Sequence, residues 1–300
     1  MSILYRPARA EDLERADGLV VESINDLTKR HGFGLKAKPR PPQFQLFSLK
    51  DDPDGLWVAE EAGQLLGFGF SWVCGELWFL AQLFISPAHQ GRGIGNELMK
   101  RTMEHAGKTG AVHKALITFT FNRVSQALYI RHGLFPRVPL YDFNIAREVL
   151  TKRLPRTQLR CVPIEDRVSH LQSLADIDIR ALGVSREKHH RFLINDGATK
   201  GMLLYDGQDC VGYAYIGPGG HIGPLAATKH DAVGPAFAAA LNLAAEGNSS
   251  QVSAFLPGPC EPALRMALEH GMQLTFPMVL LSTHDFGDWS LYLPRNPGFM

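Results

Sequence analysis

Leu83-Phe84-Ile85-Ser86-Pro87, followed by Gln90-Gly91-Arg92-Gly93-Ile94-Gly95, is the stretch that decides how this 300-residue sequence is interpreted. Residues 77–86 are nearly all apolar, as expected for a strand covered on both faces, and Pro87 ends it. Residues 96–105 then predict a helix. Three glycines let successive backbone N–H groups converge without Cβ obstruction, and the helix N-terminus adds the positive end of its dipole. The turn is predicted to bind a diphosphate; the alternative is a tight turn chosen for sterics alone.

Two other phosphate-binding motifs are excluded by the spacing. The turn does not read Gly-x-Gly-x-x-Gly, so it is not a dinucleotide-binding fingerprint. No Lys-Ser or Lys-Thr pair follows it, so it is not a nucleotide P-loop either.

The segments around the turn alternate between the apolar spacing of helices and that of strands. Apolar residues at helical spacing predict a helix after residue 10, and a polar stretch with Pro39, Pro41 and Pro42 interrupts it. A hairpin is predicted around residues 61–64, and Gly133 stands where a helix C-terminal cap is expected. The remaining predicted strands are 2–7, 56–60, 65–73, 114–121 and one or two within 135–145, and the remaining helix is 124–132.

The second half of the chain resembles the first. Residues 207–213 are similar to residues 63–68, and residues 267–271 are similar to residues 129–133. An alanine-rich helix over 235–246 stands in the place of the helix that follows Gly95. These markers suggest a duplication, with residues 151–160 as a connector. We therefore expect two tandem domains, 1–150 and 156–300, each an α/β fold with a mixed sheet.

The turn and the segment after it resemble the GNAT superfamily of acyl-CoA-dependent N-acyltransferases. The family's signature is Gln/Arg-x-x-Gly-x-Gly/Ala between a strand and a helix, and Gln90, Gly93 and Gly95 match it. Asn122 and the segment 127–135 are similar to the family's Asn, Leu-Tyr and Gly-Phe pattern. The two motifs lie in the right order at the right separation, and the resemblance covers roughly residues 56–145.

The resemblance implies a role for each residue of the two motifs. The turn would hold the pyrophosphate of acetyl-CoA, and the strand end would contact the pantetheine arm and polarise the thioester carbonyl. Tyr129 would be the general acid for the leaving thiolate. Asn122 would bind coenzyme A or order the helix that carries Tyr129. The implied cofactor-binding residues are Leu83, Phe84, Ile85, Gln90, Gly91, Arg92, Gly93, Ile94, Gly95, Asn122 and Tyr129.

The general base is left open by the sequence. Members of the family often have a glutamate on the strand before the turn, where this chain has Gln82, which cannot accept a proton. Glu76, His113 and His31 are candidates, and a chain of water molecules would serve as well.

The second half lacks the residues that carry this chemistry. Residues 229–235 retain one glycine of the turn and place Asp231 where phosphates would be repelled, and Ala267 stands at the position of Tyr129. We expect this half to have kept a fold and lost the chemistry. It would then form a wall of the acceptor cleft or bind a ligand of its own.

Composition narrows the remaining possibilities. The formal net charge of +1 gives no field that would attract nucleic acid, and no apolar run approaches a membrane span. Four scattered cysteines fit neither a disulfide framework nor a zinc site, so we expect a cytoplasmic protein without a metal.

The sequence therefore predicts an N-acetyltransferase that transfers an acetyl group from acetyl-CoA to the primary amine of a small molecule or peptide. A non-catalytic acyl-CoA-binding sensor or regulatory protein is the alternative, and a third possibility gives the second half an unrelated, substrate-binding fold. No nucleic-acid or membrane partner is expected, and the protein would be a monomer or a homodimer.

Overall fold

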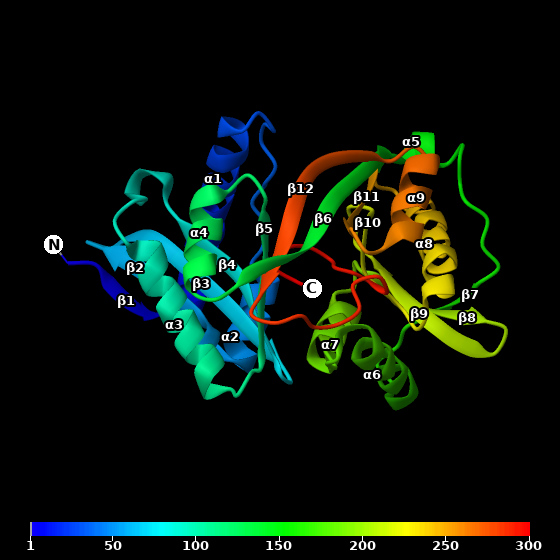
Figure 1. The fold of residues 1–300 in the computed structure, drawn as a ribbon, viewed down its shortest axis with the longest axis horizontal. Helices are drawn as coiled ribbons and strands as arrows, with labels where there is room; N and C mark the ends of the chain where they lie inside the picture. Colours follow the sequence, from blue (N-terminus) through cyan, green and yellow to red (C-terminus); the bar gives the residue numbers. More distant parts are fainter. Residues whose placement is uncertain (1) are drawn as a thin grey trace. The chain divides into compact units, whose positions relative to one another are not determined.

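The computed structural model describes residues 2–300, and their helices and strands follow one order twice (Figure 1). The first half comprises β1 (Leu4–Pro7), α1 (Leu13–Arg30), α2 (Gln43–Asp51), β2 (Leu56–Glu61), β3 (Gln64–Cys74), β4 (Leu77–Ile85), α3 (Ile94–Lys108), β5 (His113–Phe119), α4 (Arg123–Arg131) and β6 (Phe135–Ala146). The short helix α5 (Arg147–Leu150) follows. The second half comprises β7 (Arg160–Pro163), α6 (Val168–Leu182), α7 (Glu187–Asn195), β8 (Lys200–Asp206), β9 (Asp209–Ile216), β10 (His221–Ala227), α8 (His230–Ala245), β11 (Gln251–Pro257), α9 (Glu261–Glu269) and β12 (Gln273–Ser282), and β13 (Tyr292–Leu293) comes last.

The repeated order confirms that the chain is a tandem α/β protein with mixed sheets, as the sequence predicted. The predicted strand before the glycine turn and the helix after it are β4 and α3, and the predicted helix 124–132 is α4. Helix α8 begins at His230 rather than at Pro235, so Pro235 lies inside the helix, past its first turn, and removes one intrahelical hydrogen bond. Residues 135–146 form one strand. Helix α2 was not predicted, because Gln43-Phe44-Gln45-Leu46 alternates like a strand.

The residues divide into two compact units. Unit 1 is Met1–Phe135 with Leu281–His284, and unit 2 is Pro136–Leu280 with Asp285–Met300. The sequence placed the boundary within residues 150–156 instead. The difference arises because β6 pairs antiparallel with β11 over seven registered residues, Leu140–Ala146, and so lies in the sheet of unit 2. The end of β12 follows β5 in the sheet order and lies in unit 1. Each unit therefore contains a strand segment from the other half of the sequence.

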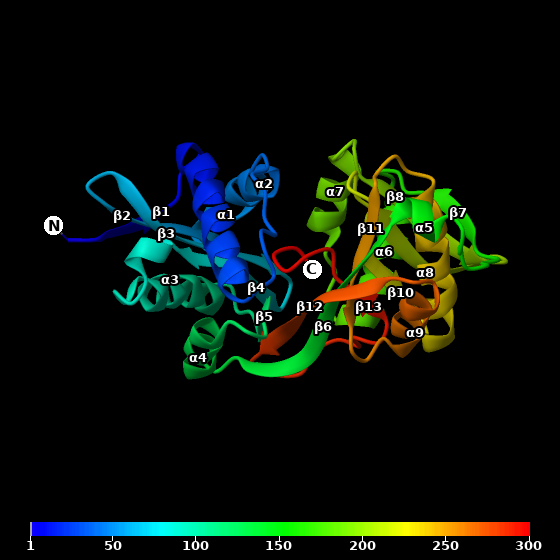
Figure 2. The same ribbon diagram turned by 90° about the horizontal axis from the view of Figure 1, so that it is seen from above.

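Unit 1 is a twisted sheet in the order β1-β2-β3-β4-β5, antiparallel except for the parallel pair β4 and β5. Helices α1 and α2 cover one face, and α3 and α4 cover the other (Figure 2). Phe70 contacts the ring of Phe44 on α2, whereas its neighbour Ser71 hydrogen-bonds to His105 on α3, as expected when successive strand residues face opposite sides. The core between sheet and helices is apolar and includes the fully buried Trp72, Phe68 and Phe79.

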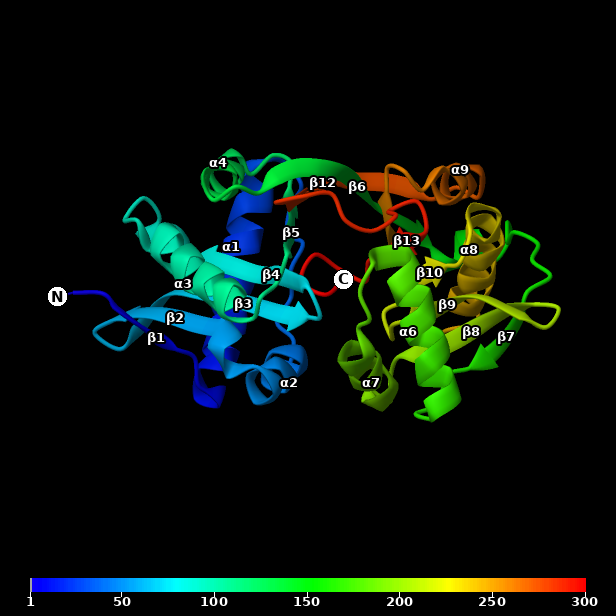
Figure 3. The ribbon, with the colours of Figure 1, turned by 60° about the horizontal axis from the view of Figure 1, so that its bottom comes forward.

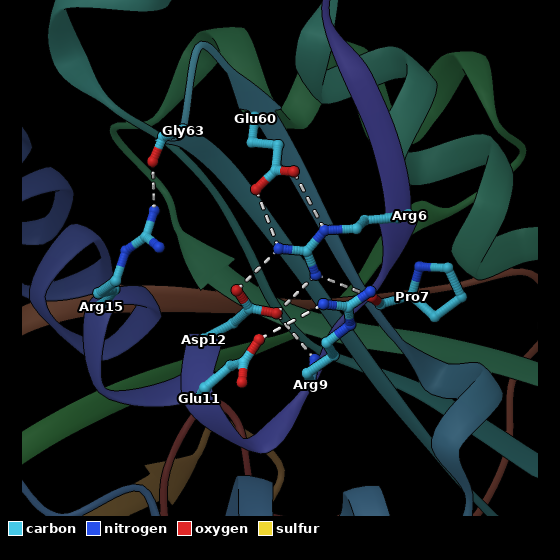
Figure 4. A network of polar contacts seen from close by, with 8 residues as sticks. All are labelled: Arg6, Pro7, Arg9, Glu11, Asp12, Arg15, Glu60 and Gly63. Atoms are coloured by element: carbon cyan, nitrogen blue, oxygen red, sulfur yellow. Dashed lines mark hydrogen bonds and ion pairs between the residues drawn. The ribbon is translucent and has the colours of Figure 1, made fainter.

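A polar network fixes the start of unit 1 (Figure 4). Arg6 on β1 donates to both carboxylate oxygens of Asp12, at 2.6 and 2.9 Å, and to Glu60 on β2, at 2.9 and 3.2 Å. Asp12 also accepts from the backbone N–H of Arg9 at 2.8 Å. The side chain of Asp12 is 2% exposed, and its hydrogen bonds with Arg6 hold its pKa below the usual value. The network joins β1, β2 and the turn that leads into α1.

Unit 2 repeats this arrangement with the order β6-β11-β10-β9-β8-β7. Helices α6 and α7 lie together on one face of the sheet, and α8 and α9 lie on the other (Figure 3). Alanines make α8 smooth enough to pack closely against β9 and β10, and nearly all of its apolar side chains are buried.

Candidate active site

Strands β4 and β5 separate halfway along their length, and this opening is the centre of the candidate site. Their parallel pairing runs from Leu77 opposite His113 to Leu80 opposite Leu116, and in the described chain the ladder ends there although both strands continue. On the other side of β4, a bulge places Ala81 between two consecutive registered pairs with β3. Beyond the bulge, the backbone groups of β4 that point toward β5 are not used by that ladder.

The glycine turn follows the open part of β4. Gly91 and Gly93 have φ values of 83° and 81°, in the left-handed region that glycine adopts without strain. Apart from the adjoining residues of the chain, no atom lies within 4 Å of the position that a Cβ would take at either residue. The turn therefore combines a backbone that requires glycine with free space beside it, both of which an anion cradle needs.

Helix α3 starts directly from this turn without a side-chain cap. Gly93 is its N-cap, and the first intrahelical bond runs from the N–H of Glu97 to the carbonyl of Gly93 at 3.2 Å. The N–H groups of Ile94, Gly95 and Asn96 come before that bond, so they have no acceptor within the helix. Together with the helix dipole they favour a bound anion.

Gly95 brings the two sequence motifs together. A Cβ at this residue would lie 3.6 Å from the side chain of Ile85 and 3.7 Å from that of Leu128. The end of β4, the start of α3 and the middle of α4 therefore pack against one another, and Tyr129 is the neighbour of Leu128 on α4. A hydrogen bond of 3.0 Å between His132 and Asn96 links the same two helices.

Tyr129 is buried, with 5% of its surface exposed. Desolvation raises the pKa of its phenol to about 12, and a hydrogen bond with the Ser125 side chain opposes this shift. The phenol therefore keeps its proton at any physiological pH. Asn122 is the N-cap of α4, and its Oδ1 accepts from the backbone N–H of Ser125 at 3.2 Å. Of the two roles considered for Asn122, this contact supports ordering the helix that carries Tyr129.

The polar residues of the turn already have protein partners. The Gln90 amide donates to the carbonyl of Ile85 at 3.4 Å, which ties the turn back to the end of β4. The Arg92 guanidinium pairs with Glu61 at 3.1–3.2 Å, and this hydrogen bonding lowers the pKa of the Glu61 carboxyl. The main chain of the turn, rather than these side chains, is thus available to a ligand.

The position of the expected base is occupied by an amide pair. Gln82 accepts a hydrogen bond from Gln45 of α2 at 3.3 Å. Glu76 and His113 are joined by a backbone hydrogen bond at the start of β4, roughly 16 Å along the strand from Gln82. His31 lies beyond the end of α1, where its ring contacts Phe121 at 4.9 Å. The first two candidates therefore lie away from the open end of β4.

Sequence reasoning missed Ser23 of α1. Its hydroxyl is buried and donates to the Ile85 carbonyl at 3.1 Å, so it fixes the last residue of β4. Ser23 and Ile85 are far apart in the sequence, and no local pattern around Ser23 indicates the contact. Gln45 was missed for a different reason, since α2 itself was not predicted.

The second half has no corresponding turn. Residues 87–93 separate Ser86 from α3, whereas Lys229 alone separates Thr228 from α8. Ala267, which the sequence aligned with Tyr129, is buried on α9.

A hollow of about 410 Å³ in unit 1 is lined by Arg15, Leu19, Glu22, Gly63, Gln64, Leu65 and Ser86. Arg15 donates to the carbonyl of Gly63 at 2.9 Å, and Glu22 brings a negative charge. Residues 2–300 contain no group of three or more His, Cys, Asp or Glu side chains arranged to hold a metal ion. None of the described helices has both the length and the apolarity needed to cross a membrane.

Comparison with known proteins agrees with this geometry. The model of the acetyltransferase (GNAT) family matches residues 21–134. An uncharacterised N-acetyltransferase of Archaeoglobus fulgidus is 30% identical over 111 residues, which are 34% of this chain and 71% of that protein. Two solved structures have the same fold over nearly the whole chain. A candidate acetyltransferase of Pyrococcus horikoshii has a TM-score of 0.78 at 16% identity, covering 99% of this chain and 96% of that one. A tandem GNAT protein of the clavulanic acid biosynthesis pathway has a TM-score of 0.64 at 15% identity, covering 94% and 98%. The chain belongs to the GNAT family of acetyltransferases, with two copies of the family's fold in tandem.

Proposed function

We propose that the first half binds acetyl-CoA at the open end of β4 and transfers its acetyl group to a primary amine in a ternary complex. The observation that carries this proposal is the position of Gly95 beside both Ile85 and Leu128. This packing supports the proposal, because the glycine turn, the end of β4 and the helix of Tyr129 come together there, as acyl transfer from a long diphosphate-bearing thioester requires.

Each part of the site would hold one part of acetyl-CoA. The N–H groups from Arg92 to Gly95 would bind the pyrophosphate, with the dipole of α3 adding to the attraction. The main-chain groups of Leu83–Ile85 that the two ladders leave unused, apart from the Ile85 carbonyl, would pair with the two amides of the pantetheine arm, which extends like an added strand. Ser23 and Gln90 support this role, because both donate to the Ile85 carbonyl and hold the end of β4 in place.

The chemistry is a direct attack by the neutral amine on the thioester carbonyl. A C–N bond forms and the C–S bond breaks, which yields an amide and coenzyme A with a free thiol. A main-chain N–H of Leu83–Ile85 would stabilise the negative charge that develops on the carbonyl oxygen. Tyr129 would give its proton to the leaving sulfur and regain one from the amine nitrogen. Its pKa of about 12 keeps the phenol protonated until the thiolate leaves.

A protonated amine would have to lose one proton before it could attack, and this chain has no carboxylate at position 82 to accept that proton. Gln82 and Gln45 can orient water by hydrogen bonds but cannot accept a proton at neutral pH. We therefore assign the removal of this proton to a chain of water molecules. The acetyl acceptor in this proposal is the amine of a small molecule or peptide.

Calorimetric titration with acetyl-CoA tests the cofactor site. We expect saturable binding to the intact protein and none to Gly93→Asp, because a carboxylate and a Cβ in the cradle would repel the pyrophosphate. Gly110→Asp is the matched control. Gly110 also has a positive φ, 70°, with no atom within 4 Å, but it lies in the turn after α3. Loss of binding in Gly110→Asp as well would mean that backbone strain, not the cradle, explains the result.

A non-catalytic acyl-CoA sensor is a second candidate, favoured by Gln82 at the position where a base is expected. An enzyme would release free thiol when an amine is added, and a sensor would bind and release acyl-CoA unchanged. A thiol assay with a panel of amines separates the two.

A further inference from the structure

Strand β10 of unit 2 is the counterpart of β4, residue by residue. Both strands pair with the preceding strand through a bulge, and the register continues beyond it. Gly67, Phe68 and Gly69 of β3 correspond to Gly212, Tyr213 and Ala214 of β9, since each set precedes the bulge. By their partners in these sets, the residues Leu83, Phe84 and Ile85 correspond to Leu225, Ala226 and Ala227.

In unit 2 this edge is not free. Parallel pairing of β10 with β11 is registered for His221 and Ile222, and farther along β10 pairs antiparallel with β13 instead. Leu225 lies opposite Leu293 and Ala226 opposite Tyr292, and the N–H of Ala227 donates to the carbonyl of Leu291 at 2.9 Å. The three positions that correspond to Leu83–Ile85 are therefore all paired with residues 291–293. This edge of β10, at residues 225–227, is called the cleft of the second half below.

The same segment also reaches the start of α8, the counterpart of α3. Ser290 Oγ lies 3.1 Å from His230 Nε2, and an Asp288 carboxylate oxygen lies 3.7 Å from the same atom. Lys229 forms an ion pair with Asp231 at 3.5 Å nearby. A carboxylate thus stands close to the end of α8 that would otherwise face the diphosphate.

Buried charges hold the segment in place. Arg186 is 1% exposed, donates to Asp178 at 3.0 Å and to Tyr213 at 2.8 Å, and bonds to the main-chain oxygen of Met300. Its guanidinium lies 4.9 Å from the ring centre of Tyr292. Tyr292 and Leu293 are both fully buried, as in a packed core. Leaving β10 would expose both side chains and take the Tyr292 ring away from Arg186, so the segment is an integral part of unit 2.

We propose that the cleft of the second half is a peptide site whose ligand is the chain's own segment 288–293. The segment takes the place of the pantetheine arm along β10, and the chain therefore binds one acyl-CoA, in the first half. The number of acyl-CoA molecules bound per chain rests on the proposed function. The occupation of β10 by residues 288–293 does not depend on that function.

Hydrogen exchange on the unmodified protein tests the occupied cleft alone. We expect the amides of Ala227 and Leu291 to be protected as strongly as those of the core strands, both without ligand and with saturating acetyl-CoA. The Leu291 amide donates to the carbonyl of Asp288 at 2.9 Å and reports on the segment itself. Rapid exchange, or protection lost when acetyl-CoA is added, would overturn the proposal.

A reversible disulfide between β10 and β13, called the lock, tests how many acetyl-CoA molecules each chain binds. Leu225 and Leu293 lie directly opposite each other in an antiparallel pair, where Cα atoms are about 4.5–5.5 Å apart, within the range that a disulfide bridges. We expect Leu225→Cys/Leu293→Cys to bind one acetyl-CoA per chain in both the oxidised and the reduced form, as the unmodified protein does. Leu293→Cys alone, treated with the same oxidant, controls for the natural cysteines.

The outcomes separate this proposal from the proposed function. Two acetyl-CoA per chain in the reduced protein, falling to one on oxidation, would show that the segment leaves the cleft and would overturn the inference. Binding that survives Gly93→Asp but is lost in the lock would do the same. If the unmodified protein binds no acetyl-CoA, the proposed function fails, and hydrogen exchange alone decides whether the segment fills the cleft.

Discussion

At the scale of single residues, Tyr129 carries the clearest expectation for the chemistry. Replacing it by phenylalanine removes only the hydroxyl, which is buried and hydrogen-bonds with the Ser125 side chain. We expect Tyr129→Phe to lower kcat by about a hundredfold or more, the usual contribution of a general acid, with little change in KM for acetyl-CoA. Tyr205→Phe, on β8 of unit 2, is the control and should leave both constants unchanged.

The pH dependence adds a second test of the same residue. Burial raises the pKa of Tyr129 to about 12, above its usual value of 10. The phenol is therefore still protonated at pH 10, and it should cause no decline in kcat up to that pH. A fall of kcat with an apparent pKa near 9, absent from Tyr129→Phe, would contradict the burial of the phenol.

Arg6 carries the clearest expectation for stability. Arg6→Ala leaves the buried Asp12 carboxylate without its guanidinium partner, and we expect the free energy of unfolding to fall by about 3 kcal/mol. Arg9→Ala is the matched control, because Arg9 pairs with the exposed Glu11 and keeps its backbone bond to Asp12, so the loss should stay below about 1 kcal/mol. Urea denaturation of both variants measures the difference.

Acid should reduce the loss of stability that Arg6→Ala causes. The pKa of Asp12 is lowered in the folded state, so its contribution is fully present above its usual pKa and is lost as the pH falls through the lowered value. The difference between wild type and Arg6→Ala should therefore shrink below about pH 4.

At the scale of elements, α4 depends on its N-cap. Asn122→Ala removes the acceptor for the Ser125 N–H, which costs about 1 kcal/mol and loosens the first turn of the helix that carries Tyr129. We expect reduced kcat and stability in this variant, and near-normal values in Asn122→Ser, because serine also caps helices. Equal loss of activity in both variants, with stability retained in Asn122→Ser, would instead support a direct contact of Asn122 with coenzyme A.

The elements also show which parts of the site could be predicted from the sequence. The turn after β4 was predicted because its glycines, strand and helix form one contiguous signal, and the structure places Gly95 against both Ile85 and Leu128. Contacts such as that of Ser23 with Ile85 join residues distant in sequence, and no periodicity encodes them. The roles of Tyr129 and of the turn residues in catalysis and cofactor binding remain predictions.

At the scale of the whole molecule, the sequence could not predict which strands pair with one another. The apolar pattern of β6 identifies a strand, but the pattern is equally compatible with pairing in either half. In the structure, β6 pairs with β11 in unit 2, and unit 1 includes Leu281–His284. A duplicated fold can therefore be read from one sequence while the exchange of its closing strands cannot.

This exchange makes the two halves of the sequence dependent on each other. A fragment of residues 1–150 would keep β6 without β11 and would lose Thr283, which exchanges hydrogen bonds of 3.0 and 3.2 Å with Lys114 of β5. A fragment of residues 156–300 would leave the edge of β11 open. Because open edges pair with other chains, we expect each fragment alone to aggregate, and the two produced together to form a soluble one-to-one complex that binds acetyl-CoA. Size-exclusion chromatography with light scattering measures this directly. A monomeric fragment 1–150 with unchanged acetyl-CoA binding would show that unit 1 closes its sheet without residues 281–284, and that the exchanged strands contribute little to its stability.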